Sequence, residues 1–290
     1  QRELGLRLMQ ILGFDFHHWR LDVSLHPFTG GATVDQRITT RYGEADFSSS
    51  LMGTIHETGH ALYEQHLPQA WRHQPVGGAR GMVVHESQSL LLEMQAARSR
   101  EFLSFAEPLM REVFGVGEGD AAWQPENLFH LYTRVSRSLI RTEADEVSYP
   151  AHVILRYRLE RALIAGDLAL RDLPGAWNEA MKALLGVVPP DDRLGCLQDI
   201  HWYDGAFGYF PTYTLGAMAA AQLFDAAGKA IAGLPALIAR GEFGPLVDWL
   251  AENVHAKASY VSTREVLIAA TGRALNPDVF KAHLEARYLA

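Results

Sequence analysis

Apolar residues recur every three to four positions along most of this chain. That spacing places them on one face of a helix, where a protein core can cover them. The pattern predicts helices over Leu51–Leu67, Met82–Leu109, Leu128–Ile140, His152–Ile164, Ala176–Leu185, Tyr213–Leu223, Leu246–Val254 and Val279–Leu289. Start signals support two of these helices, since Ser48–Ser50 precedes the first and Asn276 with Pro277 opens the last. We therefore expect a mainly α-helical fold.

Residues that favour extended backbone are confined to two short segments, Trp19–Ser24 and Val34–Tyr42. The second segment contains the β-branched residues Ile38 and Thr39, which are common in strands. The residues between the two segments, His26–Thr33, are expected to form a loop. We therefore predict a small antiparallel β-sheet set into the helical body.

Composition places the chain among globular proteins. It has 290 residues, of which 48% are hydrophobic and 21% are charged, so it can bury a sizeable core. Two stretches rich in Pro and Gly, Pro68–Gly81 and Gly186–Gln198, are expected to be loops rather than flexible linkers. Residues 1–290 are therefore predicted to form a single domain.

Charge and cysteine content exclude several classes of protein. The 26 Lys and Arg residues against 34 Asp and Glu give a net charge of −8, which argues against nucleic-acid binding. No apolar run approaches the roughly 18 residues of a membrane span, so no membrane partner is expected. Cys196 is the only cysteine, which excludes an intrachain disulfide framework and a multi-cysteine metal site. With one thiol and no secretory signal in residues 1–12, a cytoplasmic location is expected.

Two of the thirteen histidines, His56 and His60, stand in the pattern His-Glu-Thr-Gly-His. Residues four apart on a helix project from one face, so both imidazoles can bind one Zn²⁺. Glu57 lies about 100° away around the helix, where it borders the metal without binding it and can accept a proton from water. This motif therefore predicts a catalytic metal site.

The residues alone leave the third metal ligand open. Glu86 and Glu93 lie on the same face of the next predicted helix, two turns apart, so only one of them can bind the metal. Glu86 is favoured over Glu93, and His85 is a further candidate. His66 falls where one class of metallopeptidase has a third histidine ligand. Because the helix should continue toward it, His66 is expected to face away from the metal.

Three other segments are unusually polar or aromatic. Asp35–Thr39 presents polar side chains on one face of a predicted strand, either as a solvated edge or as the wall of a cleft. Ile140–Glu146 mixes one cation with three acids, and taken alone it favours a salt-bridged surface. Gly195–Tyr213 is irregular and aromatic, and it fits a site wall and a packed loop equally well.

Together these motifs resemble the carboxypeptidase Taq family of metallocarboxypeptidases. The resemblance rests on His56–Gln65, Asp35–Thr39, His85–Ser87, Ile140–Asp145 and Gly195–Trp202, with support from His26–Phe28 and Gly208–Pro211. It implies a gluzincin-like, mainly helical fold with the small sheet beside the active-site cleft. It also implies a Zn²⁺ cofactor, with Co²⁺ as an alternative, and a homodimer that removes single residues from peptides with a free C-terminal carboxylate.

The resemblance implies roles for the residues of the metal site. His56, His60 and Glu86 are implied as the metal ligands, which favours Glu86 over Glu93. Glu57 is implied as the general base.

Substrate-binding residues are implied in the same way. Arg141 corresponds to the cation that holds the substrate's C-terminal carboxylate. His201 and Tyr209 correspond to the donors that meet the scissile carbonyl oxygen. Asp35 and Arg37 are expected to contribute to substrate binding, with Asp35 able to orient a ligand imidazole.

The chain differs from family members in one large respect, because it starts after the long, mostly helical N-terminal region that covers their active-site groove. Its complete helical pattern favours a naturally short member over a fragment. Without that cover we expect an open cleft and broad specificity. The sequence thus predicts a zinc-dependent metallocarboxypeptidase. The alternatives are a gluzincin-type endopeptidase or aminopeptidase, and a non-catalytic metal-binding protein.

Overall fold

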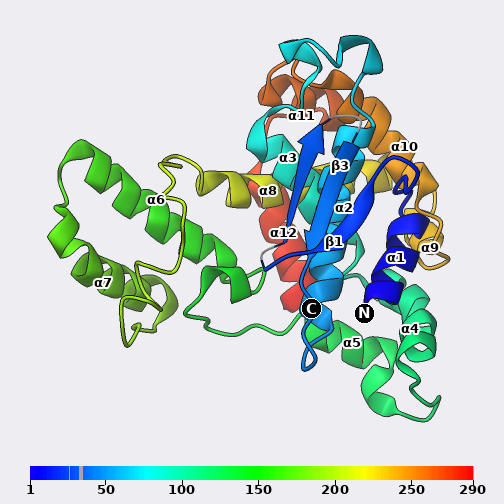
Figure 1. The fold of residues 1–290 in the computed structure, drawn as a ribbon, viewed down its shortest axis with the longest axis horizontal. Coiled ribbons are helices and arrows are strands. Elements are labelled where there is room, and N and C mark those ends of the chain that lie inside the picture. Colours follow the sequence, from blue (N-terminus) through cyan, green and yellow to red (C-terminus); the bar gives the residue numbers. More distant parts are fainter. Residues whose placement is uncertain (26, 33–34, 290) are drawn as a thin grey trace. The chain divides into compact units, whose positions relative to one another are not determined.

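The computed structural model of the protein describes residues 1–25, 27–32 and 35–289. Helices dominate these residues, which confirms the mainly α-helical fold class (Figure 1). The chain divides into two compact units, one of Gln1–Tyr132 with Gly216–Ala290 and the other of Thr133–Leu215. Each unit has its own apolar core. The single domain over residues 1–290 stays a prediction. Within the described ranges no helix is both long enough and apolar enough to cross a bilayer.

The first unit is built around α2 (Ser48–Gln65), which carries the His-Glu-Thr-Gly-His motif on a helix as predicted. Its apolar face, including Leu51 and Ile55, is buried with Leu4 and Leu8 of α1 (Arg2–Ile11). The other helices of this unit are α3 (Gly81–Leu90), α4 (Arg100–Phe114), α5 (Pro125–Tyr132), α9 (Leu234–Ile238), α10 (Gly244–Asn253), α11 (Thr263–Thr271) and α12 (Pro277–Tyr288). α8 (Pro211–Ala230) begins in the second unit and continues into the first.

The predicted helix Met82–Leu109 is interrupted. α3 ends at Leu90, a π-helical segment covers Leu91–Ala96, and α4 begins after Ser99. The Ser99 hydroxyl accepts the Phe102 N–H at 3.2 Å, which satisfies an amide at the start of α4 that has no helical partner. The continuous helix over this range was therefore wrong. The π-helical segment also changes the direction in which its side chains project.

The predicted helix Leu128–Ile140 also ends early, at Tyr132. Side chains bind the backbone beyond that point: the Ser136 N–H donates to Asp145, and the Ile140 N–H donates to the Ser138 hydroxyl. Such local bonds offer the backbone an alternative to the helical hydrogen bonds, which explains the early end.

Three strands form one sheet in the order β1 (Arg20–Val23), β3 (Asp35–Thr40), β2 (Phe28–Ala32). β2 pairs antiparallel with β3, whereas β1 pairs parallel with β3. The small sheet is thus mixed, and the antiparallel pairing of the first and last strands was wrong. β3 packs against α2 through its buried residue Ile38 and Ala61 of the helix.

A strand that the sequence patterns did not predict, β2, explains that difference. β2 lies in the segment predicted as a loop, His26–Thr33. Its residues Gly30 and Gly31 gave no strand signal, because glycine is uncommon in strands. β2 comes between β1 and β3 in the sequence and runs opposite to both, so β1 and β3 point the same way. His26, Thr33 and Val34, which bound two of the predicted segments, lie outside the described residues.

The second unit is centred on α6 (Tyr149–Ala165) and α7 (Leu173–Leu185), which pack side by side (Figure 1). Leu155 of α6 is buried with Trp177 and Met181 of α7. A single 3₁₀ turn, Arg141–Glu143, precedes α6. Cys196 is buried in the same cluster.

Candidate metal centre and active-site residues

α2 presents His56 and His60 from one face, as their spacing predicts. Their rings meet edge to face with centroids 4.9 Å apart. His66 follows the last residue of α2, where its Nδ1 pairs with the Leu62 carbonyl oxygen at 2.7 Å and its ring stacks on His255. The helix thus continues to His66 as expected, and His66 does not belong to the pair.

Close helix packing brings Glu86 of α3 to these imidazoles. A Cβ on Gly59 of α2 would lie 2.6 Å from the Gln88 carbonyl oxygen of α3, and a Cβ on Gly216 of α8 would lie 2.7 Å from the Glu86 Cβ. Only glycine permits both approaches. α2 and α8 therefore both pack closely against α3 around Glu86, which is 4% exposed.

His56, His60 and Glu86 point their donor atoms at one another. The Nε2 atoms of His56 and His60 lie 3.7 and 3.8 Å from Oε2 of Glu86. All three donor atoms lie within 4.8 Å of one another. These separations are too long for hydrogen bonds. They are close to the edge of about 3.3–3.5 Å that follows for a tetrahedron with metal–ligand bonds near 2.1 Å.

The chemistry of the three donors also fits a divalent cation. Two imidazoles and one carboxylate are the ligand set of a catalytic zinc site, with a fourth position open to water or substrate. Burial raises the pKa of Glu86, so the protein by itself disfavours its negative charge. A cation between the three donors would offset that cost.

Glu93 and Arg98 hold the other side of His56. Nδ1 of His56 pairs with Oε2 of Glu93 at 2.9 Å, and Arg98 donates to Oε1 of Glu93 at 2.6 Å. Burial lowers the pKa of His56, but the hydrogen bond and charge of Glu93 raise it overall to about 9. Glu93, the alternative ligand of the sequence interpretation, thus contacts the nitrogen of His56 that faces away from Glu86.

His85 and Glu64 hold the other side of His60. Nδ1 of His60 lies 2.7 Å from Nδ1 of His85, and Nε2 of His85 lies 3.0 Å from Oε1 of Glu64. Burial lowers the pKa of His60 well below the usual histidine value, with the neighbouring His56 and His85 acting in the same direction. His85, which the sequence also left open as a ligand, contacts a ligand candidate instead.

Glu57 borders this cluster from α2 and is 7% exposed. The hydroxyl of Thr29 in β2 donates to Oε2 of Glu57 at 2.5 Å and lies 3.2 Å from the Glu57 carbonyl oxygen. Sequence reasoning missed Thr29 because it lay in a predicted loop. The signal that could have found it is its place directly after Phe28, the last residue of a family motif.

Asp35 and Arg37 pair with each other on β3. Arg37 donates to both carboxylate oxygens of Asp35, at 2.6 and 2.8 Å, and both side chains are about half exposed. Among the described hydrogen bonds, it is Glu93 rather than Asp35 that orients the imidazole of His56. Substrate binding by Asp35 and Arg37 stays a prediction.

In the second unit, Arg141 is buried rather than part of a salt-bridged surface. Its Nε and Nη2 donate to Oδ1 of Asp199 at 3.0 and 2.8 Å, and its Nη1 donates to the Tyr149 hydroxyl. Arg156, which is fully buried, donates to the other carboxylate oxygen at 2.6 Å. Burial opposes ionisation of Asp199, but Arg156 and Arg141 hold its pKa below the usual value. Two guanidinium groups share this carboxylate, so Asp199 compensates only one of their charges.

His201 and Tyr209 lie together in the same unit. Their ring centroids are 5.3 Å apart, and Nε2 of His201 pairs with the Tyr213 hydroxyl at 3.1 Å. The guanidinium carbon of Arg141 lies 4.8 Å from the Tyr213 ring. Burial, followed by the charge of Arg141, lowers the pKa of His201, which favours the neutral imidazole.

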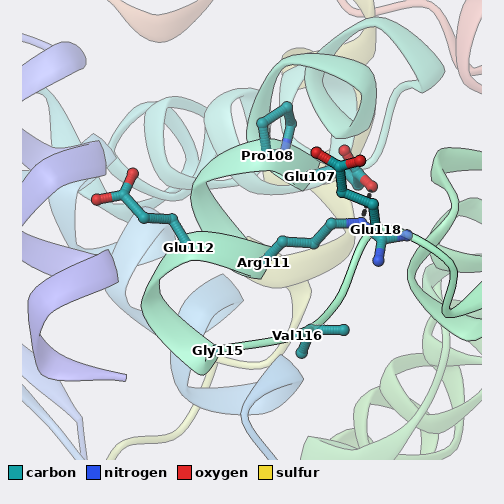
Figure 2. A pocket seen from close by; sticks show the side chains of 7 residues that line it. All are labelled: Glu107, Pro108, Arg111, Glu112, Gly115, Val116 and Glu118. Atoms are coloured by element: carbon teal, nitrogen blue, oxygen red, sulfur yellow. Dashed lines mark hydrogen bonds and ion pairs between the residues drawn. The ribbon is translucent and has the colours of Figure 1, made fainter.

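A cavity of about 490 Å³ lies elsewhere in the first unit, at the C-terminal end of α4 (Figure 2). Its lining consists of Glu107, Pro108, Arg111, Glu112, Gly115, Val116 and Glu118, none of which is a predicted site residue. Arg111 pairs with Glu107 and donates to the backbone carbonyls of Gly117 and Asp120. These bonds fix the end of the helix.

Comparison with known proteins places these motifs in a family. The model of the Carboxypeptidase Taq (M32) metallopeptidase family matches residues 1–288. Thermostable carboxypeptidase 1 of Thermus thermophilus is 44% identical over all of this chain, and carboxypeptidase 1 of Bacillus subtilis is 39% identical over 99% of it. The alignments cover 56% and 57% of those relatives, so the chain spans little more than half their length.

Solved structures agree with this assignment. Metallocarboxypeptidase 1 of Trypanosoma cruzi matches with a TM-score of 0.96 and 45% identity, over 100% of this chain and 60% of that one. An M32 carboxypeptidase of Deinococcus radiodurans matches with a TM-score of 0.95 and 42% identity, over 99% of this chain and 58% of that one. The resemblance drawn from the motifs is thereby confirmed.

Proposed function

Since the chain belongs to the carboxypeptidase Taq (M32) family of metallopeptidases, we propose that it is a metal-dependent carboxypeptidase of broad specificity. It hydrolyses the last bond of peptides with a free C-terminal carboxylate. The observation that carries this proposal is the convergence of His56, His60 and Glu86 beside Glu57 on two closely packed helices.

We propose Zn²⁺ as the cofactor, with Co²⁺ as an alternative. His56, His60 and Glu86 would hold the ion, and the two-imidazole, one-carboxylate set supports zinc. When bound, the metal lowers the pKa of a water molecule and polarises the scissile carbonyl group.

Glu57 is the general base. One oxygen of its carboxylate, Oε2, accepts a hydrogen bond from the Thr29 hydroxyl, and the other, Oε1, accepts the proton of the attacking water. Glu57 then passes this proton to the nitrogen of the leaving amino acid, so that this amino acid departs as a neutral amine rather than as an amide anion. Its burial supports this role, because bulk water is kept from competing for the proton.

Arg141, His201 and Tyr209 act on the substrate. The excess positive charge of Arg141 and Arg156 over Asp199 supports binding of the substrate's terminal carboxylate by Arg141. His201 and Tyr209 donate hydrogen bonds to the carbonyl oxygen as it gains negative charge. The homodimer and the cytoplasmic location stay predictions alongside these roles.

Replacing Glu57 by Gln tests the general base. We expect bound zinc to be retained and peptide hydrolysis to fall by at least about 100-fold, in line with the loss of a positioned proton acceptor. Zinc content is measured by elemental analysis, and release of the terminal residue from a peptide by mass spectrometry. Full hydrolysis with zinc retained would falsify the assignment.

The same mass measurement separates the alternative activities. A peptide with an amidated C-terminus should resist the protein, and a peptide with an acetylated N-terminus should be cleaved normally. Internal cleavage of a peptide blocked at both ends would indicate an endopeptidase, and loss of N-terminal residues would indicate an aminopeptidase.

A further inference from the structure

Three side chains form a hydrogen-bonded line that ends at the candidate metal centre. Glu64 and His60 lie one turn apart on α2, and His85 lies between them on α3, directly before Glu86. The contacts measure 3.0 Å from Glu64 Oε1 to His85 Nε2 and 2.7 Å from His85 Nδ1 to His60 Nδ1. The three side chains are only 10–18% exposed, so bulk water competes little for these contacts.

The chemistry of each group sets the direction of these hydrogen bonds. A carboxylate can only accept, so the proton between Glu64 and His85 lies on Nε2 of His85. A neutral imidazole with its proton on Nε2 has a lone pair on Nδ1, so His85 Nδ1 accepts the proton of His60 Nδ1. His60 then carries no proton on Nε2, the nitrogen that lies 3.8 Å from Glu86.

We infer that His85 and Glu64 are positioning residues that hold His60 in the tautomer required of a metal ligand, with its Nε2 lone pair directed at the metal position. This inference rests on the proposed metal centre. His56 obtains the same polarity directly from Glu93, whose carboxylate accepts from Nδ1 of His56. The two histidines are thus oriented by two carboxylates, one in direct contact and the other through an intervening imidazole.

Zinc affinity of the full chain tests the inference without any measurement of activity. Zinc is removed by dialysis against a chelator, and Zn²⁺ alone is titrated back in competition with a fluorescent zinc indicator. The His85→Phe variant keeps a ring but removes the acceptor, and we expect zinc binding to weaken by about 10–100-fold. The His85→Asn variant should recover part of the affinity, because its Oδ1 can occupy the place of Nδ1 and accept from His60.

Glu64→Ala supplies the distinguishing measurement. Because Glu64 acts only through His85, its removal should weaken zinc binding in the wild-type background and have no further effect in the His85→Phe background. His66→Phe is the matched control, since His66 is a neighbouring imidazole that contacts Leu62 and His255 rather than a ligand candidate. Its zinc affinity should equal that of the wild type. Circular dichroism of each variant verifies that it is folded.

The outcomes separate this inference from the proposed function. Equal zinc affinity of His85→Phe and the wild type overturns the inference and leaves the metal centre standing. Additive losses in the double variant also overturn it, because they indicate two independent structural effects. If the wild type binds no zinc, both the metal centre and the inference fail. Loss of affinity in His85→Phe, partial recovery in His85→Asn and no added loss in the double variant support it.

Discussion

At the scale of single residues, the hydrogen bond from the Thr29 hydroxyl to Glu57 is the contact closest to the proposed chemistry. The hydroxyl donates to Oε2 of Glu57 at 2.5 Å, and a hydrogen bond to a charged, buried partner contributes about 1.5–3 kcal/mol. Thr29→Val keeps the shape and removes the donor, so the Glu57 carboxylate loses its fixed orientation. We expect kcat to fall about 10–100-fold with KM and zinc content little changed. Steady-state kinetics with a short peptide, together with zinc analysis, measure both.

Thr29→Ser is the control for that experiment, because it restores the hydroxyl without the methyl group. It should recover most of kcat. If Thr29→Val and Thr29→Ser lose kcat equally, the effect comes from packing of the methyl group rather than from the hydrogen bond.

Arg141 leads to a second residue-scale prediction. Arg141→Ala removes one of the two guanidinium groups that share Asp199, so the buried cluster loses its excess positive charge. Hydrolysis of peptides with a free terminal carboxylate should fall about 100-fold or more, as expected for a charged contact of about 3 kcal/mol. The slow residual cleavage of the corresponding amides should change far less. Parallel assays of an acid and amide pair measure the difference, and an equal loss on both substrates contradicts the role of Arg141.

At the scale of elements, the contact of α2 with α3 determines whether Glu86 can reach the histidines. A Cβ on Gly59 would lie 2.6 Å from the Gln88 carbonyl oxygen and from the Ser89 Cα, both of which are backbone atoms. Gly59→Ala must therefore push the two helices apart. We expect a loss of about 1–3 kcal/mol in unfolding free energy and a clear loss of zinc affinity. Chemical denaturation and zinc titration measure the two effects.

Gly53→Ala is the matched control on the same helix. A Cβ at Gly53 meets nothing within 4 Å, so alanine there should leave zinc affinity unchanged and stabilise the helix by up to about 1 kcal/mol. If both alanine variants bind zinc like the wild type, close approach at Gly59 is not what positions Glu86.

The elements also show how far sequence patterns predict this fold. α2 follows from apolar periodicity, because its apolar face is wide and its interior lacks proline. β2 does not, because Gly30 and Gly31 carry no strand signal and the strand exists only through pairing with β3. A pattern of period 3.6 also misses the π-helical segment Leu91–Ala96, because the hydrogen bonds of a π-helix join residues five rather than four apart.

The candidate site follows the same division. The spacing of His56 and His60 is local, so the sequence predicts their shared face. The position of Glu93 depends on a π-helical segment, which is why spacing alone could not separate its role from that of Glu86. The contact of His85 with His60 joins two helices. It depends on the close packing that Gly59 permits, which local sequence patterns do not predict.

At the scale of the whole molecule, a buried histidine makes the second unit sensitive to acid. His152 of α6 is fully buried, and burial, followed by the positive charge of Arg156, lowers its pKa to about 4. In an unfolded chain the pKa of a histidine is about 6.5. Between these values the unfolded chain binds a proton that the folded chain does not. Stability therefore falls as pH drops from about 6.5 to 4, by up to about 3 kcal/mol.

Urea denaturation of the full chain at several pH values between about 4.5 and 7 covers most of this window and measures the effect. Asp199 does not account for it, because its pKa lies below the usual carboxylate value and its contribution is lost only at more acidic pH. His152→Asn removes the titrating ring, so its unfolding free energy should depend less on pH than that of the wild type, whatever its absolute stability. A slope equal to that of the wild type would show that other groups cause the acid sensitivity. A reduced slope assigns a share of the acid sensitivity to this imidazole, next to the guanidinium cluster proposed to bind the substrate's carboxylate.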